Sequence, residues 1–466
     1  MRSDIGRNLH GAIICRSKLG FAFLKFKFIL RSKVMKKFKN NTGMRSFLIL
    51  WGGESISLLG SALTKFALIL WAYQQQGTAS SITFLSFFTY LPSILFCFIA
   101  GTLADRWDKK KIMLVSNFVA AMGTLTIFIL FSLGNLYIWH LYVINFVLSF
   151  MAAFQNPAAN VAVSMLAPKE QYVRVSGLQS FSNSLVNIIS PALATALFAF
   201  GGLKIIFAID LFSFGIAILS LMFFIHIPHI RVDERKKEQT FLKSCFEGLN
   251  FLKEHKALLR IILLFSFINL LAYLTGFGIL PAMILARTGD NQPVLGLVSS
   301  FIGIGTLVGS IIVTMIKPAK RKTRVIFYSL AISFVLANVL WAVGNNAWIW
   351  VFAAFAGNLP LPFVTANMTT IMRTNVPEQM QGRVFSTRDT LQFFTIPLGL
   401  FFSGILADKV FEPFMGNASP IQQFLSIVVG TGKGSGMAVM FLITGVAGFL
   451  VSLLALLNPV YKELDS

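Results

Sequence analysis

The chain has 466 residues, of which 56% are hydrophobic and 12% are charged. Soluble globular proteins carry about 25% charged residues, so this composition excludes an ordinary soluble domain and predicts an all-α integral membrane protein. The net charge of +22 would favour nucleic acid as the partner of a soluble protein, but the basic residues lie in loops between predicted membrane helices, which excludes nucleic acid.

Residues 1–43 form a basic N-terminal extension, which we place in the cytoplasm. They hold eleven basic residues and one acidic residue. Their apolar patch "LGFAFLKFKFIL" is too short to span a bilayer, which takes about 20 residues. Three interpretations stay open: an amphipathic segment on the membrane surface, a transit peptide, or a stretch that is disordered or untranslated, with Met35 as the true first residue.

Twelve apolar runs follow, each long enough to cross about 30 Å of hydrocarbon. A charged segment from His226 to Arg260 divides them six and six. The predicted organisation is a six-helix domain at 44–227, a cytoplasmic linker at 228–258, a second six-helix domain at 259–458 and a cytoplasmic tail at 459–466. The runs are centred near Gly60, Pro92, Thr124, Val147, Asn187, Ser213, Leu271, Gly305, Phe334, Gly357, Leu400 and Gly445.

The distribution of Lys and Arg sets the orientation, because cytoplasmic loops of membrane proteins carry an excess of basic residues. With both termini in the cytoplasm, 35 of the 40 basic residues lie on the cytoplasmic side. The outer side holds Lys204, Arg287, Lys409 and Lys433, and Lys65 lies within the membrane. This asymmetry predicts a multi-pass protein of the plasma membrane with both termini inside the cell.

The two halves repeat each other at an offset of about 209 residues. The stretches "LAPKEQYVRVSGLQSF" and "NVPEQMQGRVFSTRDT" each place a proline, Pro168 or Pro377, six residues before an arginine, Arg174 or Arg383. Gly101 has a counterpart in the second half at an offset of 208. A duplicated six-helix unit with binding near the membrane midplane is typical of transporters.

The most specific motif is "GTLADRWDKKKIM", which follows the second apolar run. Gly101 permits a close approach of two helices, and Asp105 can lie against the positive N-terminus of a neighbouring helix. The motif resembles the loop between the second and third helices of the major facilitator superfamily, whose pattern is G-x-L-a-D-r-x-G-r-k. Asp108 replaces the second glycine of that pattern.

The resemblance implies twelve transmembrane helices as two six-helix pseudo-repeats around a central cavity, the major facilitator fold. It also implies that Asp105 and Arg106 clamp the cytoplasmic side shut and release for alternating access. The stretches "ISLLGSALTKFAL" and "GILADKVFEPFM" are similar to the macrolide-efflux branch of drug:proton antiporters, which implies export of macrolides or other amphiphiles. The expected conformational gate consists of Gly101, Asp105, Arg106, Lys109, Arg174, Arg383 and Asp389.

Glu54 and Lys65 are charged residues inside the first apolar run. A charge in lipid costs about 2.5–3.5 kcal/mol on insertion scales, so both side chains should face protein or water. Eleven residues return to nearly the same face of a helix, and Ser57, Ser61 and Thr64 lie between them, so one polar stripe runs along this helix. The resemblance implies that the stripe faces the central cavity.

An apolar cavity disfavours the charged form of a carboxyl group, so Glu54 is a candidate to bind a proton on one side of the membrane and release it on the other. Two alternatives stay open for Glu54: a structural acid paired with an arginine near the gate, and direct contact with a cationic substrate. Lys65 either snorkels to the outer interface or contacts substrate. Asp210 is a second proton-coupling candidate, for which a structural role is favoured.

Other polar residues of the apolar runs are candidates to line the cavity, with interhelical hydrogen bonding as the alternative for each. The three cysteines have no metal-ligand spacing, and no metal site is predicted. The predicted cavity set is Glu54, Ser57, Ser61, Lys65, Gln155, Asn156, Asn183, Asn187, Asn269, Tyr273 and Asn358.

The sequence has no HExxH motif, no Ser-His constellation at membrane depth and no GxxxxGK[ST] loop, so neither a membrane enzyme nor an ATP-driven transporter is favoured. We expect a secondary active transporter that exports amphiphilic drugs such as macrolides, confers antibiotic resistance, uses the proton gradient and needs no cofactor. A siderophore or lipid-like metabolite is the alternative substrate, and a ligand sensor without transport is a further alternative. The expected partners are a small-molecule substrate and membrane lipids, and the protein is expected to be a monomer.

Overall fold

The computed structural model describes residues 42–168, 171–225, 241–317, 319–377 and 380–465. Within these ranges it gives no placement for the side chains of residues 42–43, 97–106, 173, 241–246 and 382. The predicted N-terminal extension, apart from its last two residues, and the first part of the predicted linker therefore lie outside the described residues.

The described residues are almost entirely helical and contain no β-strand. The first half comprises α2 (Thr42–Gln76), α3 (Ala79–Arg106), α4 (Lys109–Ser132), α5 (Ile138–Leu166), α6 (Tyr172–Leu219) and the π-helical turn η2 (Ser220–Phe224). Helix α7 (Phe241–Glu254) follows in the linker region.

The second half begins with α8 (Lys256–Leu274), α9 (Leu280–Thr288), α10 (Gln292–Met315), α11 (Lys322–Phe334), the π-helical turn η4 (Val335–Val339), α12 (Leu340–Val343), α13 (Ala347–Asn358) and α14 (Leu361–Asn375). It continues with α15 (Gln381–Phe393), α16 (Thr395–Leu406), the π-helical turn η6 (Ala407–Phe411), α17 (Glu412–Gly416), α18 (Pro420–Val429), α19 (Ser435–Leu457) and the 3-10 helix η7 (Pro459–Asp465).

Eleven helical stretches of the described residues are long and apolar enough to cross a membrane. One of them, Arg174–Phe224, contains both the fifth and the sixth predicted spans. Gly202 joins these spans with a φ of 62°, a conformation that glycine adopts without strain. The all-α membrane fold predicted from composition is confirmed, and the eleven stretches hold all twelve predicted spans.

The connection between α3 and α4 is short, and Asp108 caps the N-terminus of α4. Its Oδ1 accepts hydrogen bonds from the backbone N–H groups of Lys110 at 2.9 Å and Lys111 at 3.3 Å. An acidic residue at the N-cap satisfies N–H groups that have no partner inside the helix and interacts favourably with the helix dipole. Asp108 therefore fixes the start of α4 at the position where the family pattern has glycine.

Helices α6 and α15 begin in the same way, at the offset of 209 residues that the sequence indicates. Before α6 the N–H of Gln171 donates to the carbonyl oxygen of Pro168 at 2.9 Å. Before α15 the N–H of Met380 donates to the carbonyl oxygen of Pro377 at 2.9 Å. The repeated sequence thus makes the same backbone hydrogen bond before both helices.

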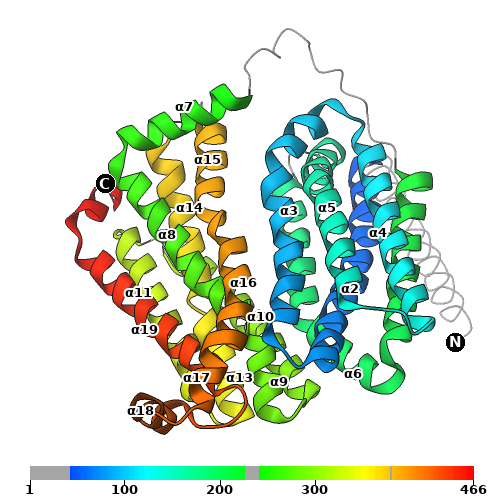
Figure 1. Ribbon diagram of the computed structural model, residues 1–466. Helices are drawn as coiled ribbons and strands as arrows, with labels where there is room; N and C mark the ends of the chain where they lie inside the picture. Colours follow the sequence, from blue (N-terminus) through cyan, green and yellow to red (C-terminus); the bar gives the residue numbers. More distant parts are fainter. Residues whose placement is uncertain (1–41, 169–170, 226–240, 318, 378–379, 466) are drawn as a thin grey trace, which may run out of the picture.

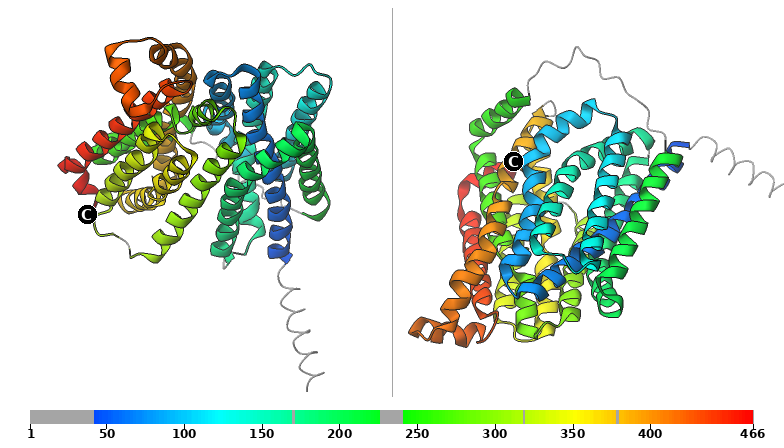
Figure 2. Two further views of the ribbon diagram at one scale, coloured as in Figure 1. Left: turned by 90° about the horizontal axis from the view of Figure 1, so that it is seen from below. Right: turned by 45° about the vertical axis from the view of Figure 1, so that its right-hand side comes forward.

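Helices α2–α6 form one bundle and α8–α19 form a second, and the two stand side by side (Figure 1). The view from below in Figure 2 shows the same two bundles. They come closest at the end that carries α9 and α17 and diverge toward the end that carries α7 (Figure 1). Contacts between the bundles are made mainly by α16 on α3 and by α10 on α6.

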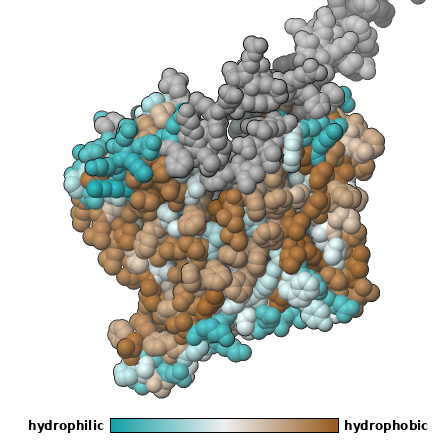
Figure 3. All heavy atoms as spheres, turned by 45° about the horizontal axis from the view of Figure 1, so that its top comes forward, coloured by the Kyte–Doolittle hydropathy of each residue, from teal (hydrophilic) through white to brown (hydrophobic). Residues whose placement is uncertain are grey.

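The surface matches a lipid environment. Figure 3 shows a broad hydrophobic band across the face in view, with hydrophilic residues at its upper and lower edges. Large apolar side chains are strongly exposed on both bundles, including Phe200 at 91% and Ile427 at 83%. Such exposure is unfavourable in water and favourable in hydrocarbon, so the chain is a multi-pass membrane protein.

Glycines bring α10 close to α13. A Cβ atom at Gly305 would overlap the carbonyl oxygen of Phe355 and lie 3.1 Å from its Cα. We expect Gly305→Val to lower the free energy of unfolding by about 1–3 kcal/mol, the usual effect of overpacking, measured as a lower thermal unfolding midpoint of the purified protein. Gly215→Val is the matched control, because a Cβ there meets no atom within 4 Å. Equal losses in both variants would contradict this packing argument.

Candidate functional site

Glu54 ends a chain of hydrogen bonds that crosses three helices. Asn117 of α4 donates through Nδ2 to Oε1 of Glu54 at 3.1 Å. Gln155 of α5 donates through Nε2 to Oδ1 of Asn117 at 2.8 Å. Asn117 is buried, whereas Glu54 and Gln155 are half-buried. Among the described residues, the hydrogen-bond partner of Glu54 is therefore an amide and not the arginine of the structural alternative.

Glu54 also lines a cavity of 680 Å³ between α2, α4, α5 and α6. Two contacts join α2 to α6 along its wall. Trp51 donates through Nε1 to the carbonyl oxygen of Leu178 at 3.2 Å, and the hydroxyl oxygens of Ser55 and Ser182 are 2.9 Å apart. The lining residues are Phe47, Leu50, Trp51, Glu54, Ser55, Leu58, Met113, Asn156, Ala159, Asn160, Val163, Ser176, Gln179, Ser180, Ser182 and Asn183.

The wall of this cavity is mixed in character. Glu54 is the only ionisable side chain among the described residues that line it, and neutral amides and hydroxyls make up the rest of the polar wall. Aromatic and aliphatic side chains supply the apolar part. Ligand pockets for drug-sized molecules measure about 300–1,000 Å³ and combine apolar walls with a few polar groups. The size and lining of the cavity suit an amphiphilic molecule.

The residues that line the cavity come from the first bundle. All of them belong to α2, α4, α5 and α6. Glu54 accepts its hydrogen bond from Asn117 of α4, and that Glu54 faces the central cavity between the bundles stays a prediction. Asn156 and Asn183 line the same cavity, and Gln155 is linked to Glu54 through Asn117.

Several polar lining residues were missed by the sequence reasoning. Asn160 comes one helical turn after Asn156 on α5. Ser176, Gln179 and Ser180 recur with the predicted Asn183 at spacings of three and four residues along α6, which places them on one face of the helix. A search for polar residues with helical periodicity in the fifth apolar run would have found this face.

The polar stripe of α2 divides between two environments. Ser61 and Thr64 donate to Asp210 of α6 at 3.3 and 2.8 Å, and Thr124 of α4 donates to Asp210 at 2.9 Å. Asp210 is 1% exposed and Ser57 is 4% exposed. The sequence predicted Ser57 and Ser61 as cavity residues, but neither is among the residues that line the 680 Å³ cavity, and Ser61 contacts Asp210 of α6 instead.

Lys65 lies near the contact between the two bundles. Its Nζ is 5.5 Å from the centroid of the Tyr90 ring on α3. Tyr90 in turn packs edge-on against Tyr273 of α8, with ring centroids 5.6 Å apart. A cation over an aromatic face is attracted by the ring quadrupole. Lys65 is thus directed toward α3 and the bundle interface.

Three asparagines of the predicted cavity set make other contacts. Asn269 donates through Nδ2 to the carbonyl oxygen of Gln392 at 3.0 Å, which joins α8 to α15. Asn358 is buried at 8% exposure and donates to a carbonyl oxygen one turn earlier in α13 at 2.8 Å. The backbone of Asn187 lies against Gly303 of α10. Asn358 is therefore an interior residue of the second bundle, and its amide nitrogen donates within its own helix.

The sequence model of the family described as the Major Facilitator Superfamily matches residues 50–400 of the chain. The chain belongs to the Major Facilitator Superfamily. Among its relatives, macrolide efflux protein A of Streptococcus pyogenes is 25% identical over 376 residues, which cover 80% of this chain and 92% of the relative. The enterobactin exporter EntS of Citrobacter koseri is 22% identical over 71% of this chain and 76% of its own length.

Solved structures of the superfamily share the fold. The nucleoside transporter NupG superposes with a TM-score of 0.62 at 11% identity, over 88% of this chain and 98% of NupG. A bacterial homologue of the iron transporter ferroportin superposes with a TM-score of 0.60 at 16% identity, over 91% of this chain and 99% of its own. The resemblance stated from the sequence is confirmed, and the family assigns transport of a small molecule rather than an enzymatic reaction.

The gate residues expected of a major facilitator are described only in part. The side chains of Asp105 and Arg106 and the surroundings of Gly101 lie outside what the structure describes. Arg383 of α15 forms an ion pair with Glu247 of α7. This pair joins the linker helix to the second bundle.

Three further gate candidates lie near helix ends or inside a helix. Asp389 forms an ion pair with the adjacent Arg388 at 2.6 Å, well inside α15. Lys109 is the first residue of α4, and Arg174 is exposed near the start of α6.

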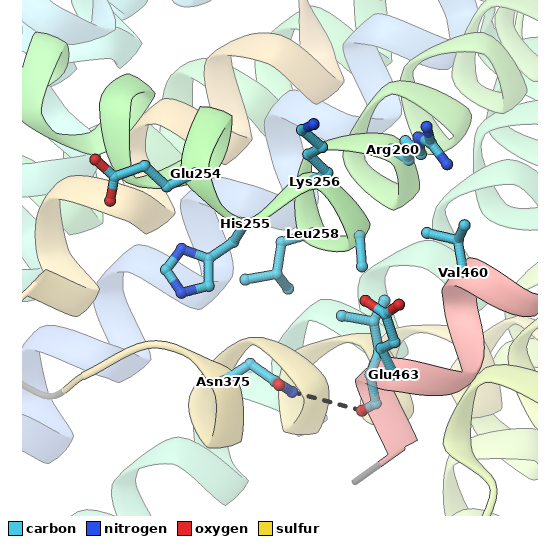
Figure 4. A pocket seen from close by; sticks show the side chains of 10 residues that line it. Glu254, His255, Lys256, Leu258, Arg260, Asn375, Val460 and Glu463 are labelled. Carbon is cyan, nitrogen blue, oxygen red and sulfur yellow. Dashed lines mark hydrogen bonds between the residues drawn. The ribbon is translucent and has the colours of Figure 1, made fainter.

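A second pocket, of 480 Å³, lies where α8 begins, beside α14 and η7 (Figure 4). Asn375 donates through Nδ2 to the carbonyl oxygen of Leu464 at 3.5 Å on its wall. Within the described ranges no three His, Cys, Asp or Glu side chains cluster as metal ligands would. Charges of both signs surround this pocket, from Glu254, Lys256, Arg260 and Glu463.

Proposed function

We propose that this protein is a proton-driven exporter of amphiphilic drugs such as macrolides. The observation that carries the proposal is the place of Glu54, the single ionisable side chain among the described residues on the wall of a 680 Å³ cavity. The similarity to macrolide efflux protein A over 80% of the chain supports the substrate class.

The proton and the substrate compete for Glu54 in this mechanism. An ionised Glu54 accepts hydrogen bonds or attracts a cationic amine of the substrate when the cavity is open to the cytoplasm. A proton that enters from the outer side removes that charge and weakens the contact, so the substrate leaves outward. Because each ligand lowers the affinity for the other, the inward flow of protons drives the outward flow of drug.

The lining of the cavity supports an amphiphile as the substrate. Trp51, Leu58 and Val163 offer apolar surface, while Asn160 and Gln179 offer donors and acceptors for hydroxyl, ether and carbonyl groups. A strongly charged substrate would need several fixed counter-charges, and the described wall supplies one.

We further propose that the end of the molecule that carries α7 faces the cytoplasm. We also propose that the protein is a monomer in the plasma membrane. The distribution of 35 of the 40 basic residues supports this orientation. The bundles diverge toward the α7 end (Figure 1), so the described conformation corresponds to an inward-facing state. Transport then proceeds as the two bundles rock about the interface formed by α3, α6, α10 and α16.

The test is the accumulation of a labelled macrolide in cells that express the full chain, compared with empty vector. We expect lower accumulation in the expressing cells, and we expect a protonophore to abolish the difference because it removes the driving force. Equal accumulation in both strains, with the protein confirmed in the membrane, would contradict macrolide export. Lower accumulation that the protonophore leaves unchanged would contradict proton coupling.

A siderophore is the second candidate substrate, favoured by the similarity to the enterobactin exporter EntS over 71% of the chain. Competition tests whether this transporter accepts both substrates. An excess of a catecholate siderophore should restore macrolide accumulation only if both molecules use one site. Purified protein in liposomes that binds a macrolide without net flux would favour a sensor over both exporters.

A further inference from the structure

The sequence contains the pattern G-x-L-A-D-[RK] twice. The first copy, "GTLADR", ends α3 at Arg106. The second copy, "GILADK", covers residues 404–409 at the end of α16 and the start of η6. Helices α3 and α16 pack against each other across the bundle interface. The offset of the two copies is not that of the internal repeat, so the second copy calls for a separate explanation.

Asp408 in the second copy contacts the opposite bundle. The backbone N–H of Ala79 donates to its Oδ1 at 3.0 Å, and that of Ser80 donates to its Oδ2 at 2.8 Å. Ala79 is the first residue of α3. Both carboxylate oxygens therefore bind the free N–H groups of a helix N-terminus, where the helix dipole favours negative charge.

Gly404 makes this contact possible. A Cβ atom at Gly404 would lie 2.5 Å from the Cα of Ser80 and 2.9 Å from its backbone nitrogen, which is closer than real Cβ atoms approach backbone. The glycine lets α16 touch the first turn of α3, and Asp408, one helical turn later, binds that turn. The remainder of this interface includes Phe401, whose ring packs 5.8 Å from that of Phe84.

A neighbouring carboxylate makes the same kind of contact inside one bundle. Glu412 accepts hydrogen bonds from the backbone N–H groups of Gly434 at 3.2 Å and Met437 at 3.0 Å, at the start of α19. A rigid rotation of the bundles leaves the Glu412 contact intact, whereas it must break the Asp408 contact when this end opens.

We propose that Asp408 is a releasable latch that holds the outer end of the transporter closed, and that it must leave the N-terminus of α3 each time the protein opens outward. This inference rests on the alternating-access part of the proposed function and is independent of the substrate and of the coupling ion. Asp408 is a positioning residue of the transport cycle and does not touch the substrate.

The test measures the opening directly, on the full chain in lipid nanodiscs without substrate. Spin labels at Gln75→Cys in the first bundle and Asn417→Cys in the second report their separation at this end, after the three native cysteines have been replaced. Both labelled positions are exposed. We expect Asp408→Asn to raise the ratio of long to short separations about tenfold, which corresponds to about 1.4 kcal/mol.

Glu412→Gln is the matched control, because it removes a carboxylate cap that does not cross the interface. It should lower the thermal unfolding midpoint and leave the distance distribution unchanged. A distribution for Asp408→Asn that matches the unsubstituted protein would overturn the latch. Equal shifts in Asp408→Asn and Glu412→Gln would also overturn it, because they would indicate general loosening.

Gly404→Ala provides a second test if Asp408→Asn does not fold. It keeps the carboxylate and forces α16 away from Ser80, so it should shift the same ratio toward the long separation. An unchanged distribution in this variant would overturn the proposal, because the close approach would then have no bearing on the opening of this end.

Discussion

Glu54→Gln is expected to abolish the response of efflux to a pH gradient while the protein stays folded. Glutamine keeps the side-chain length and can accept the hydrogen bond from Asn117 that Glu54 accepts at 3.1 Å, but it cannot take up or release a proton. Coupling free energies between two ligands of one protein are about 1–3 kcal/mol, so gradient-driven efflux should fall by about fivefold to 150-fold.

The measurement uses purified protein in liposomes with an imposed pH gradient and the macrolide established by the accumulation test. Exchange of labelled for unlabelled substrate without a gradient is measured in parallel, and it should persist in Glu54→Gln because exchange needs no proton. Asn156→Ala is the matched control on the same cavity wall. It should weaken binding of the substrate and retain the response to the gradient.

Two results would contradict the assignment of Glu54. Gradient-driven efflux by Glu54→Gln at the rate of the unsubstituted protein would show that the proton passes elsewhere. Loss of both gradient-driven efflux and exchange, even at saturating substrate, would indicate that Glu54 serves substrate binding alone and not proton coupling, which is the alternative that the sequence left open.

The membrane fold could be predicted from sequence because the length and the hydrophobicity of a span are properties of one short stretch of the chain. A run of about 20 apolar residues crosses the bilayer wherever it lies in the chain, and the charge of the loops then sets the orientation. The fifth and sixth spans were recognised separately, and in the structure the non-helical backbone of Gly202, with a φ of 62°, divides them into two helices. Local rules thus located every span.

The contacts of the polar residues could not be predicted in the same way, because helical periodicity gives the face of a residue and not its neighbour. Glu54 and Ser61 share one face of α2, yet Glu54 binds Asn117 of α4 and Ser61 binds Asp210 of α6. The partner depends on which helix packs against each level of α2. That information lies in tertiary packing, as does the Asp408 contact, whose sequence pattern was noticed only as a family resemblance.

Asp210→Ala is expected to have the largest effect on stability. Its carboxylate accepts hydrogen bonds from Ser61, Thr64 and Thr124 and so joins α2, α4 and α6 in the interior of the first bundle. Interhelical hydrogen bonds in membrane proteins contribute about 0.6 kcal/mol on average and about 1.7 kcal/mol at most, so losing all three predicts a decrease of about 2–5 kcal/mol in the free energy of unfolding. Alanine also leaves a void in a close-packed site.

Further substitutions separate this structural role from proton coupling. Asp210→Asn should retain most of the thermal unfolding midpoint, because its amide can donate to a threonine hydroxyl that previously donated. Thr124→Val should destabilise the protein by about 1 kcal/mol, whereas Thr126→Val should have no effect, because Thr126 bonds only to its own helix at Met122.

If Asp210→Asn were fully stable but lost the response to a pH gradient, Asp210 would be the proton carrier. Because its three described hydrogen-bond donors are hydroxyl groups inside one bundle, we expect instead that stability and transport fall together in Asp210→Ala and are both retained in Asp210→Asn.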